Sequence, residues 1–128
     1  MSAQVVDSSA WLEYFAVGSN AGHFAAVIEA TAELLVPSIT LLEVFKRIGQ
    51  QHDASVALRY IAVMQQAKVV ELDAAIAIRA AALGIRHKLP LADSIIYATA
   101  QAAGAVVWTQ DADFVGLADV RYFPKAAP

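Results

Sequence analysis

The chain has 128 residues, of which 59% are hydrophobic, so it is long and apolar enough to form one domain with its own core and is not disordered. It contains no cysteine, which excludes disulfides, thiolate metal sites and a cysteine nucleophile and agrees with a cytoplasmic location. Its net charge of −3 gives no sign of strong non-specific binding to nucleic acid.

The chain also lacks the patterns of membrane and secreted proteins. No uninterrupted apolar stretch reaches the about 18 residues that a membrane-spanning helix requires. The first residues carry no basic segment of the kind that opens a secretion signal. We therefore expect no membrane association and no signal peptide.

Apolar residues at helical spacing alternate along the chain with short apolar runs. The spacing predicts helices over residues 8–16, 24–34, 41–48, 56–63, 74–86 and 91–103. The runs predict strands over residues 3–6, 34–36, 69–72, 105–108 and 120–123. Residues 49–53 are expected to form a loop and residues 124–128 a frayed tail.

Polar residues at the predicted helix starts suit capping. Asp53 and Asp73 are expected to cap the fourth and fifth helices, and Ser38 or Thr40 the third. Strands that alternate with helices predict an α/β fold in which a parallel sheet is covered on both faces. In such sheets, functional groups gather at the carboxyl ends of the strands.

Four acidic residues stand beside apolar segments where an unpaired charge is costly to bury. They are Asp7, Glu43, Asp93 and Asp111. No Lys or Arg is a fixed sequence neighbour of each one, and convergence of like charges would raise their pKa values. A divalent cation resolves that conflict, and carboxylates that hold such a cation are typical of enzymes that cut phosphodiesters.

Each acid also has a structural interpretation. Asp7 is able to cap the first helix, and residues 40–43 fit a capping box in which a Glu reaches back to the cap. Asp93 suits the positive end of a helix, and Asp111 or Asp113 suits the cap of a turn. Capping is the commoner role for any one of them. Their shared place at the predicted functional edge favours a site.

Other catalytic constellations are not supported. His23, His52 and His87 have no spacing typical of zinc ligands. The serines lack a neighbouring base, and the six glycines form neither a Walker A loop nor a dinucleotide fingerprint. Two basic clusters, residues 46–47 and 86–88, are solvated surface by default, with contact to a substrate phosphate as the alternative.

Four segments together resemble the PIN-domain nucleases, and specifically the VapC-type toxins of toxin–antitoxin pairs. They are residues 5–12 (VVDSSAWL), 38–44 (SITLLEV), 89–100 (LPLADSIIYATA) and 107–114 (VWTQDADF). The resemblance spans nearly the whole chain. It implies a single PIN domain over residues 1–128, with a three-layer α/β/α sandwich around a mostly parallel sheet of four to five strands.

The resemblance also implies a metal-dependent ribonuclease. Asp7, Glu43, Asp93 and Asp111 would hold one or two Mg²⁺ or Mn²⁺ ions that activate a water for RNA hydrolysis. Either Asp111 or Asp113 would position that water. Thr109 would orient a carboxylate or a water.

The implied partners are a cognate VapB-like antitoxin and a second copy in a homodimer. Apolar surface around Trp11, Phe15 and Phe24 is the predicted docking groove of the antitoxin. Three alternatives stay open: a housekeeping RNA-processing PIN nuclease without an antitoxin, an inactive PIN binding module, and a phosphotransfer domain with Asp7 as nucleophile. The last lacks the second Asp two residues on, where Ser9 stands.

Overall fold

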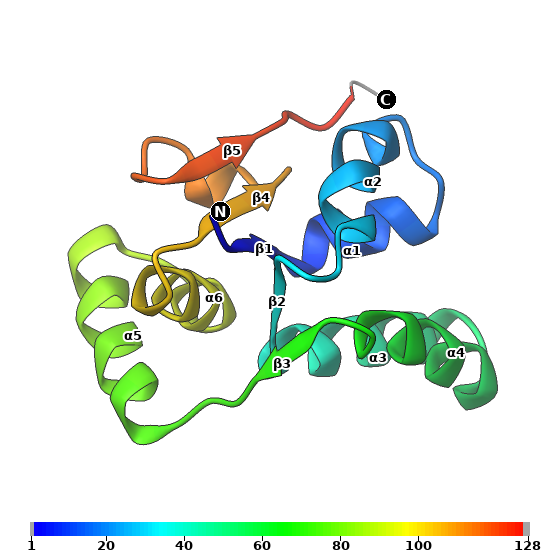
Figure 1. The fold of residues 1–128 in the computed structure, drawn as a ribbon, viewed down its shortest axis with the longest axis horizontal. Coiled ribbons are helices and arrows are strands. Elements are labelled where there is room, and N and C mark those ends of the chain that lie inside the picture. Colours follow the sequence, from blue (N-terminus) through cyan, green and yellow to red (C-terminus); the bar gives the residue numbers. More distant parts are fainter. Residues whose placement is uncertain (1, 127–128) are drawn as a thin grey trace.

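A computed structural model describes residues 2–126 and shows helices on both sides of a sheet (Figure 1). The strands are β1 (Gln4–Val6), β2 (Leu34–Pro37), β3 (Lys68–Val70), β4 (Val106–Thr109) and β5 (Val120–Tyr122). The helices are α1 (Ser8–Phe15), α2 (Ala21–Glu29), α3 (Ser38–Gln51), α4 (Ala54–Met64), α5 (Ala74–His87), α6 (Leu91–Ala102) and the short 3₁₀ helix η1 (Ala112–Phe114).

The five strands form one sheet in the order β3-β2-β1-β4-β5, and every neighbouring pair is parallel. The first strand lies at the centre, where Val5 pairs with Leu35 on one side and with Val107 on the other. The predicted α/β/α sandwich with a parallel sheet is thereby confirmed.

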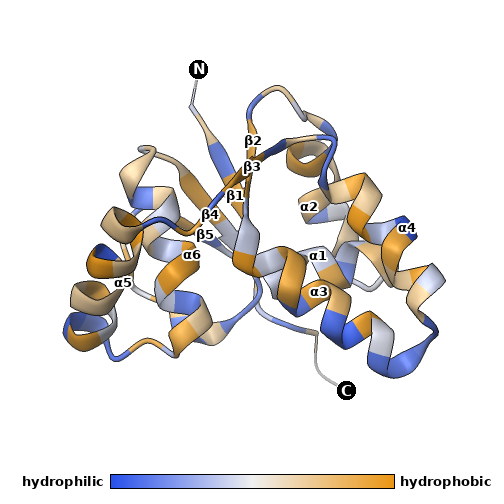
Figure 2. Ribbon diagram, turned by 90° about the horizontal axis from the view of Figure 1, so that it is seen from below, coloured by the Kyte–Doolittle hydropathy of each residue, from blue (hydrophilic) through white to orange (hydrophobic). Residues whose placement is uncertain are grey.

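The two faces of the sheet bury different sets of helices, as successive strand residues point to opposite sides. Val6 packs into a core with α1, α2, α3 and α4, whereas its neighbour Val5 packs into a core with α6 and η1. Figure 2 shows the sheet between these two layers, with α5 and α6 on one side. Both valines are fully buried, so the centre of β1 anchors both layers.

Three of the predicted helix caps are present. The carboxylates of Asp7, Asp53 and Asp73 accept hydrogen bonds from the backbone N–H three residues on, at the starts of α1, α4 and α5. The predicted cap of α3 is wrong, because the helix begins at Ser38 with Pro37 at the cap position. Thr40 already lies inside the helix and donates to the carbonyl of Pro37, so no capping box forms.

Two boundary predictions are wrong. Helix α3 continues to Gln51, since Gly49 faces open space and one exposed glycine costs a helix only about 1 kcal/mol. Helix α2 ends at Glu29, and Leu34 belongs to β2, where it is buried beside β1. Among residues 2–126, no helix combines the length and the apolar character needed to cross a bilayer.

The predicted docking groove is wrong for two of its three residues. Trp11 and Phe24 are core residues with 1% and 0% of their surface exposed, so only Phe15 offers an accessible ring. Large apolar side chains are exposed elsewhere, at Val17 in the turn after α1 and at Ile78 and Ile85 on the outer face of α5. The helical periodicity of the sequence did not distinguish the buried aromatic residues from these exposed apolar ones.

Candidate active site

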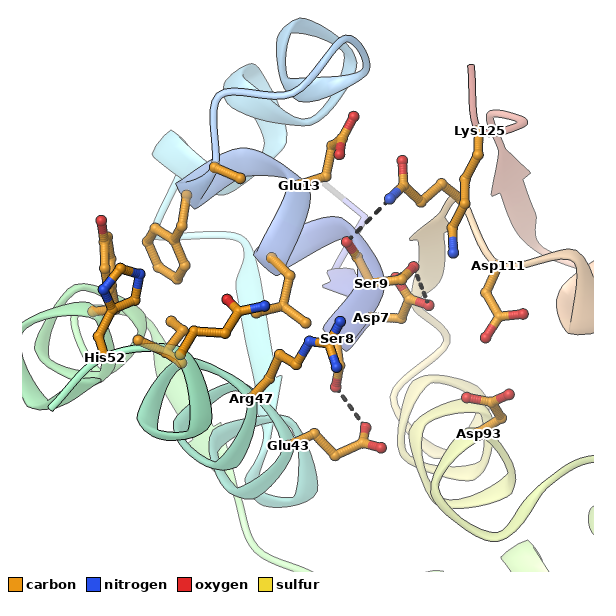
Figure 3. A pocket seen from close by; sticks show the side chains of 17 residues that line it. Asp7, Ser8, Ser9, Glu13, Glu43, Arg47, His52, Asp93, Asp111 and Lys125 are labelled. Atoms are coloured by element: carbon orange, nitrogen blue, oxygen red, sulfur yellow. Dashed lines mark hydrogen bonds between the residues drawn. The ribbon is translucent and has the colours of Figure 1, made fainter. Parts of the chain in front are cut away.

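The candidate acids converge at the carboxyl edge of the sheet. Asp7 follows β1, Asp111 follows β4, and Glu43 and Asp93 come from α3 and α6. All four line one cavity of about 610 Å³. Figure 3 shows their carboxylates pointing toward a common space, although 86 residues separate Asp7 from Asp93 along the sequence.

Asp7 is held rigidly at the back of this space. Its side chain is 1% exposed and accepts hydrogen bonds from Ser9 Oγ at 2.9 Å, the Ala10 amide at 3.0 Å and Thr109 Oγ1 at 2.7 Å. Burial raises the pKa of Asp7 to about 6, although the three hydrogen bonds act to lower it. The residue therefore caps α1 and at the same time turns a carboxylate toward the cavity.

A group of three further acids lies near Asp7. One oxygen from each of Asp93, Asp111 and Asp113 lies within 4.8 Å of the others. The pKa of Asp93 is raised to about 8 by burial, then by the charge of Asp111 and a hydrogen bond with Asp113, with further contributions from the charges of Asp7 and Asp113. Asp93 thus holds a proton at neutral pH unless a cation compensates the crowded negative charge.

Thr109 connects the two groups of acids. It is fully buried at the end of β4, donates to Asp7 Oδ2 and accepts from the backbone N–H of Asp111 at 2.8 Å. Asp111 in turn accepts from the amide of Asp113 at 2.9 Å and caps η1. One hydroxyl therefore fixes the position of a β1 carboxylate relative to the loop that carries two further acids.

Glu43 lies on the opposite wall of the cavity. It projects from the second turn of α3 and accepts a hydrogen bond of 2.6 Å from Ser8 Oγ, in the first turn of α1. It lies outside the tight group formed by Asp93, Asp111 and Asp113. The structure brings Glu43 into the same cavity as Asp7 but on a separate element.

The donor set fits a hard divalent cation. Carboxylate oxygens are the ligands that Mg²⁺ and Mn²⁺ prefer, and His is absent from the group of Asp93, Asp111 and Asp113. The raised pKa of Asp93 shows that this arrangement is unfavourable for the acids alone. A cation at this position would remove that penalty, so these residues fit the implied metal.

Two basic residues also line the cavity. Arg47 comes from α3, in one of the clusters for which phosphate contact was an alternative, and Lys125 comes from the tail after β5. The tail is held at Pro124, whose carbonyl accepts from Asn20 Nδ2 at 3.0 Å, so the frayed-tail prediction is wrong there. Residues 127–128 of that prediction lie outside the described residues. No sequence signal marked Lys125, since it is a single basic residue without a motif.

Comparison with known proteins identifies the family. The model of the PIN domain family matches residues 5–120. The chain belongs to the PIN domain family. The resemblance drawn from the four sequence segments is thus confirmed. No curated protein was found with a matching sequence.

Several solved structures with the same fold are described as toxins or toxin–antitoxin complexes. A chain of a toxin–antitoxin complex from Klebsiella pneumoniae is 25% identical with a TM-score of 0.78, covering 93% of this chain and 96% of that one. A chain of DNA-bound VapBC from Salmonella typhimurium is 19% identical with a TM-score of 0.72, over 97% and 98%. VapC20 of Mycobacterium tuberculosis, a toxin that cleaves the sarcin–ricin loop, is 17% identical with a TM-score of 0.71, over 93% and 99%.

Proposed function

We propose that this chain is a Mg²⁺- or Mn²⁺-dependent endoribonuclease and the toxin of a VapBC-like toxin–antitoxin pair. One observation carries the proposal: carboxylates from four separate elements converge in one cavity, where crowding and burial raise the pKa of Asp93 to about 8. A fold needs no such cluster for stability, because unpaired like charges destabilise it. The arrangement is therefore a functional one.

Asp7, Glu43, Asp93 and Asp111 are the proposed metal ligands. A cation bound there would lower the pKa of a water and neutralise charge that develops on the phosphate. The hydroxyl of Thr109 holds Asp7 in position relative to the loop that carries Asp111, and the hydroxyl of Ser8 orients Glu43. Such supporting hydrogen bonds fix the direction of ligand oxygens.

Asp113 is proposed as an additional acid beside these ligands, since it belongs to the tight group that Asp93 and Asp111 form. It lies within hydrogen-bond contact of Asp93 but does not line the cavity. The remaining alternative for positioning the water is Asp111, which does line the cavity. A side-chain nucleophile is not required for hydrolysis by an activated water.

An RNA substrate is supported by the cations beside the acids. Arg47 and Lys125 line the same cavity, and they are suited to bind the phosphates on either side of the cleaved bond. The remaining surface is nearly balanced in charge, since four of the twelve acidic residues belong to the site. A balanced surface does not repel a polyanion.

The proposed antitoxin site is an apolar groove between α1 and α2. The groove has a volume of about 420 Å³ and is lined by Tyr14, Phe15, Val17 and small residues of α2. Val17 is 82% exposed there, which is costly for a free surface. The structures from Klebsiella pneumoniae and Salmonella typhimurium contain toxin–antitoxin assemblies. An apolar segment of an antitoxin suits this groove.

A second copy is the proposed partner of the outer face of α5. Ile78 and Ile85 are 73% and 83% exposed, seven residues apart on one side of the helix. Two antiparallel α5 helices would place Asp73 at one helix end beside Arg86 at the other end of the second copy. The variant Ile85→Glu should then elute as a monomer in size-exclusion chromatography with light scattering.

Cleavage of total cellular RNA tests the proposed activity. The purified protein and Asp93→Asn are each incubated with Mg²⁺, Mn²⁺ or EDTA, and RNA ends are mapped by sequencing. We expect discrete fragments from the unaltered protein with a metal, none with EDTA and few from Asp93→Asn. Fragments that persist in EDTA, or from Asp93→Asn, would rule out the proposed site.

Two further results discriminate between the alternatives. Absence of cleavage from a sample that mass spectrometry shows to be free of any partner would indicate a binding module. Cleavage without an antitoxin-sized reading frame beside the gene would indicate a housekeeping nuclease.

A further inference from the structure

The cavity has a second end that differs chemically from the acidic one. This end is lined by the rings of Phe15, Tyr60 and His52. The rings of Phe15 and Tyr60 lie 4.4 Å apart between centroids and are tilted by 45°. Both are only half-buried, and His52 is exposed at the corner between α3 and α4. We call these three residues the aromatic end.

Helix α3 connects the two ends in regular steps. Glu43, Arg47 and Gln51 all line the cavity and are spaced four residues apart, so they lie on one side of the helix. Each step advances by about one helical turn, or roughly 5–6 Å along the axis. Figure 3 shows Glu43 and Arg47 on α3 and His52 beyond them, just after the end of the helix. A carboxylate, a cation and a ring thus stand in that order.

The facing wall changes in the same direction. Helix α1 contributes Ser8 beside Glu43, then Leu12, then Phe15 at the aromatic end. The spacing of four and three residues puts all three on one side of α1. The α1 wall is therefore polar where the acids lie and apolar two turns away, and the α3 wall changes from charged residues to the uncharged Gln51. A ligand that fills the cavity must combine charge at one end with a flat apolar group at the other.

We propose that the aromatic end binds an unpaired base of the RNA, next to the phosphate that is cleaved; this rests on the proposed function. A single strand presents phosphates and bases at regular intervals, and one helical turn is comparable with the spacing of successive phosphates. With the cleaved phosphate at the acids, Arg47 meets the neighbouring phosphate. The attached base then lies against Phe15, Tyr60 and His52.

The polar groups of this end favour a base over a protein side chain. Gln51 and His52 stand beside the rings, and both carry donors and acceptors suited to the edge of a base. Arg47 between the two ends suits a phosphate. The groove between α1 and α2 that we assign to a protein partner has no charged residue in its lining. The aromatic end thereby differs from that groove in the chemistry it offers.

The test uses a short single-stranded RNA that spans a cleavage position mapped in total RNA. One base at a time is removed to leave an abasic nucleotide, and kcat/KM is measured for each oligonucleotide. We expect one position within two nucleotides of the cut to lower kcat/KM by about 5- to 100-fold, through a higher KM, which is the usual effect of losing one stacked base.

Variants connect that position to the aromatic end. His52→Ala and Tyr60→Leu should lower kcat/KM on intact RNA and should no longer respond to the missing base, as coupled groups behave in a double-mutant cycle. Tyr60→Phe keeps the ring and should therefore retain the sensitivity to the missing base that Tyr60→Leu loses. Leu58→Ala is the matched control, because Leu58 is 59% exposed on the same helix and lies outside the cavity. His52 is exposed, so its variant tests the proposal even if Tyr60→Leu fails to fold.

The contrary outcomes are distinct. Cleavage that is insensitive to every abasic position, or variants that keep the full sensitivity, would overturn the base site and leave the ribonuclease standing. Variants that cut RNA normally but no longer bind the antitoxin encoded beside the gene would assign this end to a protein. An unaltered protein that cuts no RNA would overturn both the function and the base site.

Discussion

Asp7 and Asp93 lie at the same edge of the sheet, and burial raises the pKa of both, but the groups around them act in different directions. Asp7 is almost fully buried, and hydroxyl and amide donors partly offset the cost of its charge, so its pKa is about 6. Asp93 is half-buried, and this burial together with the crowding by Asp111, Asp113 and Asp7 raises its pKa to about 8. The more accessible carboxyl is thus the more strongly perturbed one.

The difference distinguishes a carboxylate with both a structural and a proposed functional role, Asp7, from one with a proposed functional role alone, Asp93. Hydrogen bonds to Asp7 also cap α1, so part of its environment serves the fold. Every major influence on Asp93 opposes its charge, so its environment serves no purpose for the acids alone. A divalent cation would benefit Asp93 more than Asp7. The following experiments examine that contrast, from the largest expected effect to the smallest.

Asp93→Asn should lower the rate of RNA cleavage by at least about 100-fold, because a charged ligand at the reacting phosphate is lost. It should not lower the melting temperature without metal, since it removes an unfavourable charge. Activity and thermal unfolding are measured on the same preparation. A large loss of stability would mean that Asp93 is needed by the fold instead.

Two substitutions of Asp7 distinguish its two roles. Asp7→Asn keeps a side-chain oxygen for the cap and should lose activity by about 100-fold or more with little loss of stability. Asp7→Ala loses the cap and leaves Thr109 without its acceptor, which should cost a further 1–2 kcal/mol or so in the free energy of unfolding. Denaturant unfolding compares them. Equal stabilities would show that the cap contributes nothing.

Thr109→Val should reduce activity by about 10- to 100-fold, because the side chain keeps its volume but loses the hydroxyl that joins Asp7 to the Asp111 loop. Ser9→Ala is the matched control. The Ser9 hydroxyl also donates to Asp7 but not to that loop, and its backbone bond from Gln110 is kept in the variant, so its loss should cost activity less. The metal concentration that gives half-maximal activity is the informative readout. An equal effect of both variants would contradict the linking role.

Stability without metal should fall as the pH rises. Asp7 and Asp93 keep protons in the folded state up to about pH 6 and 8, respectively, whereas the unfolded chain releases them near pH 4. The folded state therefore binds more protons in this window, and the free energy of unfolding decreases with pH. A melting temperature that falls by a few degrees between pH 5 and 8, and recovers with Mg²⁺, is the expected result.

Variants separate the two windows. Asp93→Asn should remove the pH dependence above pH 6 and weaken it below pH 6, whereas Asp7→Asn should weaken it only below pH 6. If the melting temperature of the unaltered protein does not depend on pH in either window, this result would argue against the crowding of these carboxyls.

The convergence of the acids that follow strands could be predicted from the sequence. Asp7 and Asp111 each follow an apolar run, and parallel strands place their carboxyl ends together, so their convergence follows from the alternation of strands and helices. Glu43 and Asp93 were also marked by the sequence, as isolated acids near the starts of predicted apolar helices, and the family resemblance implied their role as metal ligands. The fold was predictable for the same reason, because the strands are short, apolar and separated by helices.

The features that were not predicted correctly depend on contacts between segments that are distant in the sequence. The bond from Ser8 to Glu43 joins residues 35 apart, and residues 40–43 had suggested a local capping box instead. Burial of Trp11 and exposure of Val17 and Ile78 follow from which helix lies beside which, and helical periodicity looks the same for both. The place of Lys125 beside the acids depends on how the tail follows β5, a path that no motif encodes.

The central position of β1 has a consequence for the order of folding. The chain begins with this strand, but one of its two neighbours is β4, and Thr109 and Asp7 are 102 residues apart in sequence. Contacts of such long range are formed late, because a large loop must close first. A chain still under synthesis therefore has β1 but neither Thr109 nor Asp111 to complete the acid cluster. Whatever this site does, a nascent chain is unable to do it until nearly all of the domain has been made.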